Sequence, residues 1–180
     1  MPVVAADSFA SIYLPPLGDL TGVAVRLGDR QLPVIYAGNN QVNVLVPAGV
    51  AAGTYSLTVG VRFFGTIPVP VDVVDRWPGL ASAALNENGT VNSEANPAAR
   101  GTVVSLFGSG FGPLPLPVVE PFILATGVTA AQGMEVLFAG LLQVNARVPA
   151  NAVPGHTPVR VVIREPNGLV SSNLARIWIR

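Results

Sequence analysis

The sequence predicts an all-β protein made of two tandem β-sandwiches, and three observations lead to this prediction. Short apolar or alternating stretches recur along the 180 residues and are separated by glycine, proline and asparagine. No stretch has the length and periodicity of a long helix, since candidates such as 81–85 and 95–100 are short and lie beside turn-forming residues. One segment also occurs twice. The apolar content excludes a disordered chain, and glycine without a three-residue period excludes collagen.

An internal repeat divides the chain into two domains. Residues Tyr36–Gly60 align without gaps to Phe138–Val162 at an offset of 102, and ten of the 25 aligned positions are identical. Between the copies, Val73–Gly79 closes a strand pattern and contains a Pro-Gly turn signal. The predicted domains are therefore residues 1–76 and 77–180.

The repeated segment predicts two strands joined by a turn. Residues 41–46 alternate with a period of two, Pro47 ends this strand because it lacks a backbone donor, and the next strand begins after Gly53. The second copy predicts strands at 143–149 and 157–164. Further strands are expected at Gly22–Arg26, Leu32–Ala37, Ile67–Val74, Leu80–Leu85, Val103–Phe107, Met134–Phe138, Leu169–Ser172 and Arg176–Ile179.

Turn and proline signals refine this prediction. Asn88-Gly89 and Asn167-Gly168 are the strongest hairpin signals, because both residue types tolerate positive φ. Pro68 and Pro70 alternate with valines, which is typical of an edge strand whose missing donors face outward.

The charge pattern excludes a nucleic-acid surface. Ten arginines balance ten acidic residues, and basic and aromatic residues are not interleaved. Only 11% of the residues are charged, so repulsion between copies is weak and association is favoured. The absence of cysteine excludes disulfides and thiolate metal sites. No apolar run is long enough for a membrane helix, and the first residues are not typical of a signal peptide.

Several segments in both halves carry a shared pattern. In the first half they are Val4–Phe9, Tyr36 and Gln41–Pro47. In the second half they are Asn88–Ser93, Ala95–Ala98, Gly101–Gly108, Gly110–Pro113, Phe138–Gly140 and Gln143–Pro149. With these segments the chain resembles the C-terminal domain family of large secreted proteins of Acidobacteria, first noted in Solibacter.

This resemblance covers nearly the whole chain and implies two immunoglobulin-like modules without catalysis. It also implies an extracellular location and a sorting, scaffold or adhesion role. Two loops depart from the family pattern, because Leu14–Leu17 replaces a glycine-rich loop and Leu141-Leu142 replaces a longer one. The short loops disfavour a binding site on loops and favour a stand-alone protein.

No residue is predicted to be catalytic, to bind a cofactor or to ligate a metal. His156 is the only histidine and has no motif partner, so we interpret it as a surface turn residue, like Thr54 at the equivalent position. Gly108–Gly112 is followed by prolines, which exclude the helix that a phosphate loop needs, and is interpreted as a turn.

An oxygen-rich run surrounds the first hairpin signal and consists of Asn86, Asn88, Asn92 and Glu94. With Gly89 at the sixth place, an EF-hand loop would begin at Ala84 and end at Ala95, and neither is a ligand. We therefore interpret the run as a solvated turn. A different calcium loop and the use of the glycosylation sequon at Asn88–Thr90 remain open.

The domain junction suggests structural roles. Arg76 is expected to pair with Asp72 or Asp75, which would fix the angle between the domains rather than add much stability. Trp77 and Trp178 lie near the two domain ends, and we interpret them as sealing a sandwich core or packing between the domains. The alternative for each is an exposed ring that stacks on a sugar.

The predicted function is that of a non-enzymatic extracellular structural protein. It would associate with itself into a cell-surface assembly or filament, through strand edges or exchange of the terminal segments Met1–Phe9 and Leu174–Arg180. The alternative is a module for adhesion to a glycan or protein, or for export and sorting. An enzyme is disfavoured because the acidic residues are dispersed. The expected partners are thus copies of the chain, with a glycan as a further candidate and no cofactor.

Overall fold

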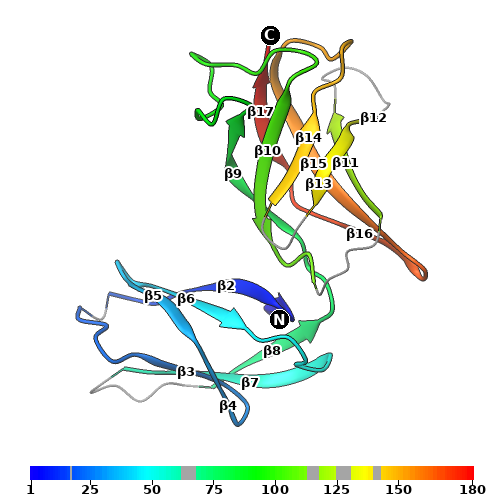
Figure 1. Cartoon of the computed structure of the whole chain (residues 1–180). Helices are drawn as coiled ribbons and strands as arrows, with labels where there is room; N and C mark the ends of the chain where they lie inside the picture. The colour runs from blue at the N-terminus through cyan, green and yellow to red at the C-terminus, as the bar shows by residue number, and fades with distance from the viewer. Residues whose placement is uncertain (17, 62–67, 113–117, 125–130, 140–142) are drawn as a thin grey trace. The chain divides into compact units, whose positions relative to one another are not determined.

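The computed structural model describes residues 1–16, 18–61, 68–112, 118–124, 131–139 and 143–180. The chain forms two compact units, Met1–Trp77 (unit 1) and Pro78–Arg180 (unit 2), which divide one residue after the predicted boundary. The described residues form strands β1 to β17 and no helix. Each unit is an immunoglobulin-like sandwich of two sheets (Figure 1).

Unit 1 packs a five-stranded sheet against a three-stranded one. The first sheet has the order β1 (Val3–Ala5), β8 (Val69–Val74), β7 (Gly53–Gly60), β3 (Ala24–Leu27) and β4 (Arg30–Leu32). The second has the order β2 (Ser8–Tyr13), β6 (Gln41–Val46) and β5 (Val34–Gly38). Because side chains alternate along a strand, β6 directs Val42, Val44 and Val46 inward, toward Val25 and Val59 of the facing sheet.

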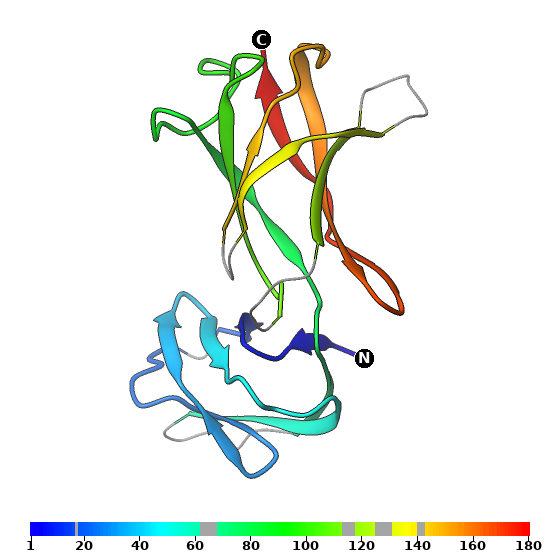
Figure 2. The ribbon, with the colours of Figure 1, turned by 45° about the vertical axis from the view of Figure 1, so that its right-hand side comes forward.

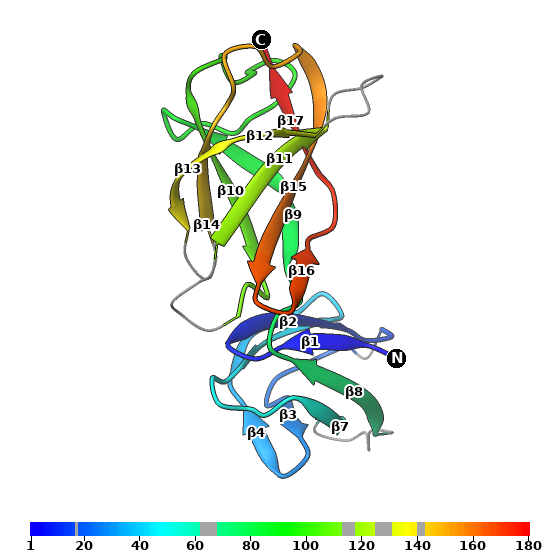
Figure 3. The ribbon, with the colours of Figure 1, turned by 90° about the vertical axis from the view of Figure 1, so that its right-hand side faces the viewer.

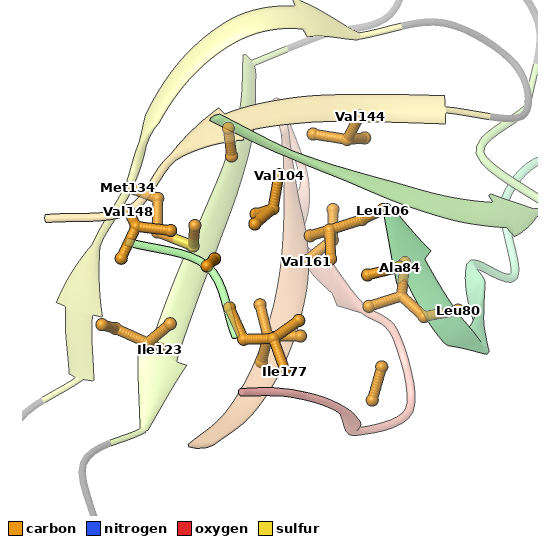
Figure 4. Close-up of a cluster of buried hydrophobic side chains, with 14 of the residues drawn as sticks. Leu80, Ala84, Val104, Leu106, Ile123, Met134, Val144, Val148, Val161 and Ile177 are labelled. Carbon is orange, nitrogen blue, oxygen red and sulfur yellow. The ribbon is translucent and has the colours of Figure 1, made fainter. Parts of the chain in front are cut away.

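Unit 2 has the same plan with an additional strand. One sheet has the order β13 (Glu135–Ala139), β14 (Gln143–Arg147), β10 (Val103–Ser109) and β9 (Gly79–Asn86). The other contains β12 (Ala131–Gly133), β11 (Val118–Leu124), β15 (Gly155–Glu165), β16 (Gly168–Ser171) and β17 (Ala175–Ile179). The first half of β15 pairs with β17 and its last residues pair with β16. Leu80 and Ala84 of β9 belong to the core between the sheets (Figure 4).

The two units repeat each other beyond the segment seen in the sequence. The Oγ of Ser8 donates to the carbonyl of Ala5 at 2.6 Å, and the Oγ1 of Thr102 donates to the carbonyl of Ala99 at 2.6 Å. The same turn therefore leads into β2 and into β10. These two strands are equivalent, and each pairs with the repeated strand β6 or β14.

Most expected strands are present, with one correction. The segment Leu32–Ala37 was expected to be one strand, but Pro33 separates β4 from β5, and these two strands belong to different sheets. The prediction missed the four strands β1, β2, β11 and β12.

The two hairpin signals form turns. Asn167-Gly168 connects β15 to β16, with Glu165 paired to Gly168 (Figure 2). At Asn88-Gly89 the amide of Gly89 donates to the carbonyl of Asn86, and Leu85 bridges to Val91. The positive φ of Gly89, 78°, explains why glycine stands there.

The prediction that the Ile67–Val74 strand is an edge strand is correct for only part of β8, and Ile67 lies outside the described residues. Residues 72–74 pair with β1 on one side, while residues 53–57 of β7 pair with β8 on the other. Pro70 therefore lies beyond the reach of β1, where its missing N–H needs no partner. Pro70 thus lies in the part of β8 that pairs with β7 alone, and β8 as a whole is not the edge strand of its sheet.

Candidate functional site

Strand β2 forms an uncovered edge in unit 1. It ends the sheet β2-β6-β5, whereas its equivalent β10 is covered by β9 in the sheet β13-β14-β10-β9. The register fixes the comparison, because Ser11 pairs with Asn43 as Ser105 pairs with Asn145. Among the described residues, no strand of unit 1 occupies the place that β9 takes in unit 2.

The missing neighbour leaves inward side chains of β2 only half-buried. Ala10 and Ile12 are partly buried, although both point toward the core of unit 1. Their equivalents in β10, Val104 and Leu106, are 0% and 2% exposed. Leu106 lies beside Ala84 of β9 in the strand register, so the added strand accounts for the difference.

A cavity opens along this edge. Its volume is about 680 Å³. It extends from the side where β1 and β2 lie next to each other (Figure 3) to the valines of β6 and β7. Its lining includes Val3, Val4, Ala10, Ile12, Val69 and Val71, and also Ser11 and Tyr13 of β2. Because most of the lining side chains are apolar, the cavity suits apolar side chains.

The outer face of the same sheet carries a polar row that both units share. The Nε2 of Gln41 donates to the Oδ1 of Asn43 at 2.6 Å, and the Nε2 of Gln143 donates to the Oδ1 of Asn145 at 2.7 Å. The conserved spacing of Gln-Val-Asn in the two copies thus has a physical cause, because residues two apart lie side by side on one face. Each glutamine Nε2 also lies 3.5 Å from a serine Oγ of the neighbouring strand, Ser11 in unit 1 and Ser105 in unit 2.

Two tyrosines lie beside this row in unit 1. Tyr13 of β2 is 76% exposed and pairs with Gln41, while Tyr36 of β5 is 43% exposed and pairs with Asn43. Neither ring was predicted from the sequence to be part of a site. Their exposure depends on register, which follows from the sheet rather than from the sequence pattern alone. Aromatic rings next to amides present a face that can stack on and hydrogen-bond to a sugar.

The only histidine has a structural partner. His156 lies in β15 rather than in a turn, which corrects the interpretation from the sequence. Its ring stacks on Trp178, with centroids 4.5 Å apart and planes inclined by 10°. The equivalent Thr54 lies in β7 and donates its hydroxyl to Asp72 at 2.6 Å. The contact of His156 with Trp178 joins β15 to β17 in unit 2, and the contact of Thr54 with Asp72 joins β7 to β8 in unit 1.

The asparagine run is a network of internal hydrogen bonds. The Oδ1 of Asn92 accepts from the backbone N–H of Trp178 at 2.6 Å, and its Nδ2 donates to the Trp178 carbonyl at 2.9 Å. The same Nδ2 lies 2.9 Å from the Oδ1 of Asn86. Asn88 accepts from Thr90 through both backbone and hydroxyl groups. Asn86 and Asn92 thus tie the loop to the rest of unit 2, which corrects the expected solvated turn at these two positions, whereas Asn88 and Glu94 are exposed as expected.

The tryptophans do not seal the cores. Trp77 is 58% exposed, so the interpretation of it as a core residue of its sandwich is wrong. Trp178 lies on the outer side of β17, because its neighbours Ile177 and Ile179 point into the core. At the junction, the carboxylate of Asp72 accepts from Thr54, and the predicted pairing of Arg76 remains a prediction.

Gly108–Gly112 does not form a simple turn. Gly108 and Ser109 belong to β10, and Phe111 is fully buried in the core of unit 2. The prolines that follow at positions 113, 115 and 117 lie outside the described residues. Gly110 and Gly112 have φ near +80°, which lets the chain turn Phe111 inward.

Charged groups do not gather into a catalytic or metal site within the described residues. Three or more His, Asp and Glu side chains do not cluster there. The hydrogen bonds from the Thr21 hydroxyl and amide lower the pKa of Asp19, which is a feature of an exposed turn. None of the described residues belongs to a helix that could cross a membrane.

Comparison with known proteins yields distant structural matches. No family model and no curated protein matches the chain. SGBP-B of the Bacteroides ovatus mixed-linkage glucan utilization locus, in complex with a mixed-linkage heptasaccharide, is 16% identical at a TM-score of 0.45, covering 98% of this chain and 45% of that one. Murine CEACAM1b is 13% identical at a TM-score of 0.34, with 99% and 96% covered. Titin Ig domains A164-A165 are 10% identical at a TM-score of 0.30, with 99% and 92% covered. These similarities are too distant to transfer a ligand or partner, and the strand order itself identifies the immunoglobulin-like fold.

Proposed function

We propose that this chain is a non-enzymatic extracellular structural module that associates with copies of itself through uncovered strand edges. The single observation that carries this proposal is the uncovered β2 edge above an apolar cavity. An edge strand offers a row of backbone N–H and C=O groups that a strand of another chain can pair with. The low content of charged residues, 11%, weakens the repulsion that would oppose such pairing.

Which two strand edges pair determines whether the copies form a closed dimer or a filament. Pairing of β2 with β2 of a second copy is a two-fold contact, which closes into a dimer. Pairing of β2 with a different edge, such as β5 or β13, is a head-to-tail contact that repeats along a filament. A filament therefore requires two different edges for each copy.

Exchange of the C-terminal segment would disrupt unit 2 itself. Ala175, Ile177 and Ile179 of β17 are buried in the core of that unit. Removal of Leu174–Arg180 would therefore test the folding of unit 2 as much as assembly. Edge substitutions in unit 1 test the proposal more cleanly.

We expect the intact chain to associate in a concentration-dependent manner, measured by light scattering on a sizing column and by negative-stain images of the same fractions. Ile12→Lys places a charge inward on the β2 edge and should abolish association, because an inward charge blocks strand addition. Ile35→Lys, on the opposite edge strand β5 of the same sheet, is the matched control for a dimer through β2. Circular dichroism verifies that both variants fold.

The outcomes separate the assemblies. Loss of association with Ile12→Lys alone indicates a β2 dimer, and loss with either variant indicates a chain of copies that uses both edges. A monomer of about 18.6 kDa at every concentration contradicts the proposal.

The second candidate function is binding of a glycan. Tyr13 and Tyr36 beside the amides of Gln41 and Asn43 favour it, since such a face combines stacking with hydrogen bonding. If the chain is monomeric, a glycan panel is the next measurement. Tyr13→Ala should then reduce binding, while Tyr55→Ala, which removes a tyrosine of β7 in the other sheet, should leave it unchanged.

A further inference from the structure

We infer that the cavity along β2 is a receptor groove for one extended strand of another polypeptide, with small or medium uncharged residues at the inward positions. This inference deepens the proposed function, because it names what fills the space beneath the same edge. The inference differs from the proposed function in one respect, because the groove can bind a strand even if the chain never associates with itself.

The second unit supplies the template for the occupant. β9 has the sequence Gly-Leu-Ala-Ser-Ala-Ala-Leu-Asn, and Leu80, Ala84 and Asn86 of this strand are buried, while Ala81 and Ala83 are exposed. This strand fills in unit 2 the place that stays open in unit 1. Two of the three buried residues, Leu80 and Ala84, are apolar and the third is the neutral amide Asn86, so the chemistry that fits is an uncharged strand with small or medium side chains on its inward face.

The register of β9 on β10 predicts where each residue of a strand bound to β2 would lie. In unit 2, Asn86 pairs with Val104 and Ala84 pairs with Leu106. The equivalent positions in β2 are Ala10 and Ile12, whose side chains line the cavity. A strand bound in the same way would place the residue equivalent to Asn86 opposite Ala10 and the one equivalent to Ala84 opposite Ile12.

One position limits the length of the bound strand. In unit 2, β9 passes so close to Gly108 that a Cβ there would meet the backbone carbonyl of Gly79. Unit 1 has Leu14 at the equivalent position, and its side chain lines the cavity. A strand in this groove therefore pairs along β2 up to Ile12 and leaves the sheet before Leu14.

The occupant is a peptide rather than a free apolar molecule, because the opening runs along a strand edge whose backbone groups select a partner that can form a β-ladder. The volume of about 680 Å³ lies within the range of ligand sites, and the lining is mostly apolar, with Ser11 and Tyr13 among its residues.

Binding of a labelled peptide tests the inference on the full chain. The probe is a synthetic peptide with the sequence of residues 79–86, whose positions 84–86 are expected to pair with residues 12–10 of β2, and fluorescence anisotropy measures its Kd. In the control peptide, prolines replace the residues equivalent to Ala84 and Leu85. Because neighbouring residues point their N–H groups to opposite sides, one of the two lost donors faces β2. We expect saturable binding of the probe, and the control peptide should bind at least about tenfold more weakly.

Cross-linking tests the register independently. The chain contains no cysteine, so each introduced thiol is unique. Ala10→Cys should form a disulfide with a peptide that carries cysteine at the position equivalent to Asn86. Ala37→Cys, on the exposed edge strand β5 of the same sheet, is the matched control and should react much less. Circular dichroism of both variants verifies that the thiols are introduced into a folded chain.

The two proposals can fail separately. A peptide that binds with the predicted register to a strictly monomeric chain upholds the groove and contradicts self-association. Self-association without peptide binding or selective cross-linking upholds assembly through another contact and overturns the groove. Three further results would overturn the groove, because each shows binding that does not use the β2 edge. The proline peptide could bind as tightly as the probe, or Ala37→Cys could react as readily as Ala10→Cys. A saturated fatty acid could also displace the bound peptide.

Discussion

At the scale of single residues, the side chain of Asn92 makes three hydrogen bonds in unit 2. One amide group joins the loop that contains it to Trp178 of β17 and to Asn86 of β9. Trp178 is 86 residues away in the sequence, so the amide adds a link between this loop and β17 to the backbone hydrogen bonds that the loop forms with β9. The hydrogen-bonding capacity of asparagine, with two donors and an acceptor, suits this place, whereas aspartate would lack the donors.

We expect Asn92→Ala to lower the free energy of unfolding of unit 2 by about 2–4 kcal/mol, because it removes several hydrogen bonds and leaves the Trp178 N–H without its acceptor. Asn88→Ala is the matched control and should cost less than about 1 kcal/mol, since that side chain bonds only within an exposed turn. Urea denaturation followed by fluorescence measures both, in a Trp77→Phe background where Trp178 reports on unit 2 alone. Equal losses would show that the network adds nothing beyond the local turn.

At the scale of elements, the contact between β9 and β10 distinguishes the two units. Gly108→Ala should destabilise unit 2 by about 1–3 kcal/mol, because the new Cβ would meet the Gly79 carbonyl and lie 3.0 Å from the Phe111 ring. Gly79→Ala is the control and should change stability by less than about 0.5 kcal/mol, since its nearest new neighbour is 4.0 Å away. The same denaturation assay measures both variants. A neutral Gly108→Ala would mean that β9 is displaced easily from β10.

The strand that forms the candidate site is the kind that sequence patterns miss. In β2 the aromatic residues Phe9 and Tyr13 point outward, while Ser8 and Ala10 point inward, which reverses the usual polarity of a strand. The repeat also shifts in this region, because β2 aligns to β10 at an offset of 94 instead of 102, as Ser8 aligns to Thr102. An ungapped alignment therefore ends before it reaches β2. The predicted tandem repeat rests on the segment that contains β6, β7, β14 and β15, and burial alternates regularly along β6, β14 and most of β15.

At the scale of the whole molecule, the two units should differ in stability. The inward residues of β2 are half-buried and border a cavity, whereas Val104 and Leu106 in unit 2 are sealed by β9. Burial of apolar surface stabilises by about 25 cal/mol for each Å², so unit 1 gains less from the side chains of this edge. Scanning calorimetry of the intact chain should therefore show two transitions, with unit 1 unfolding first.

The strand peptide of residues 79–86 should raise only the first transition. A ligand that binds the folded state alone stabilises it by about 2.7 kcal/mol at a hundredfold excess over Kd. For a domain of this size, that corresponds to an increase in Tm of about 10 °C or more. The second transition should remain unchanged, because unit 2 already contains β9 at the equivalent edge. The doubly proline-substituted peptide is the control. A rise in both transitions, or in the second alone, would place the binding site outside unit 1 and separate it from the open edge of β2.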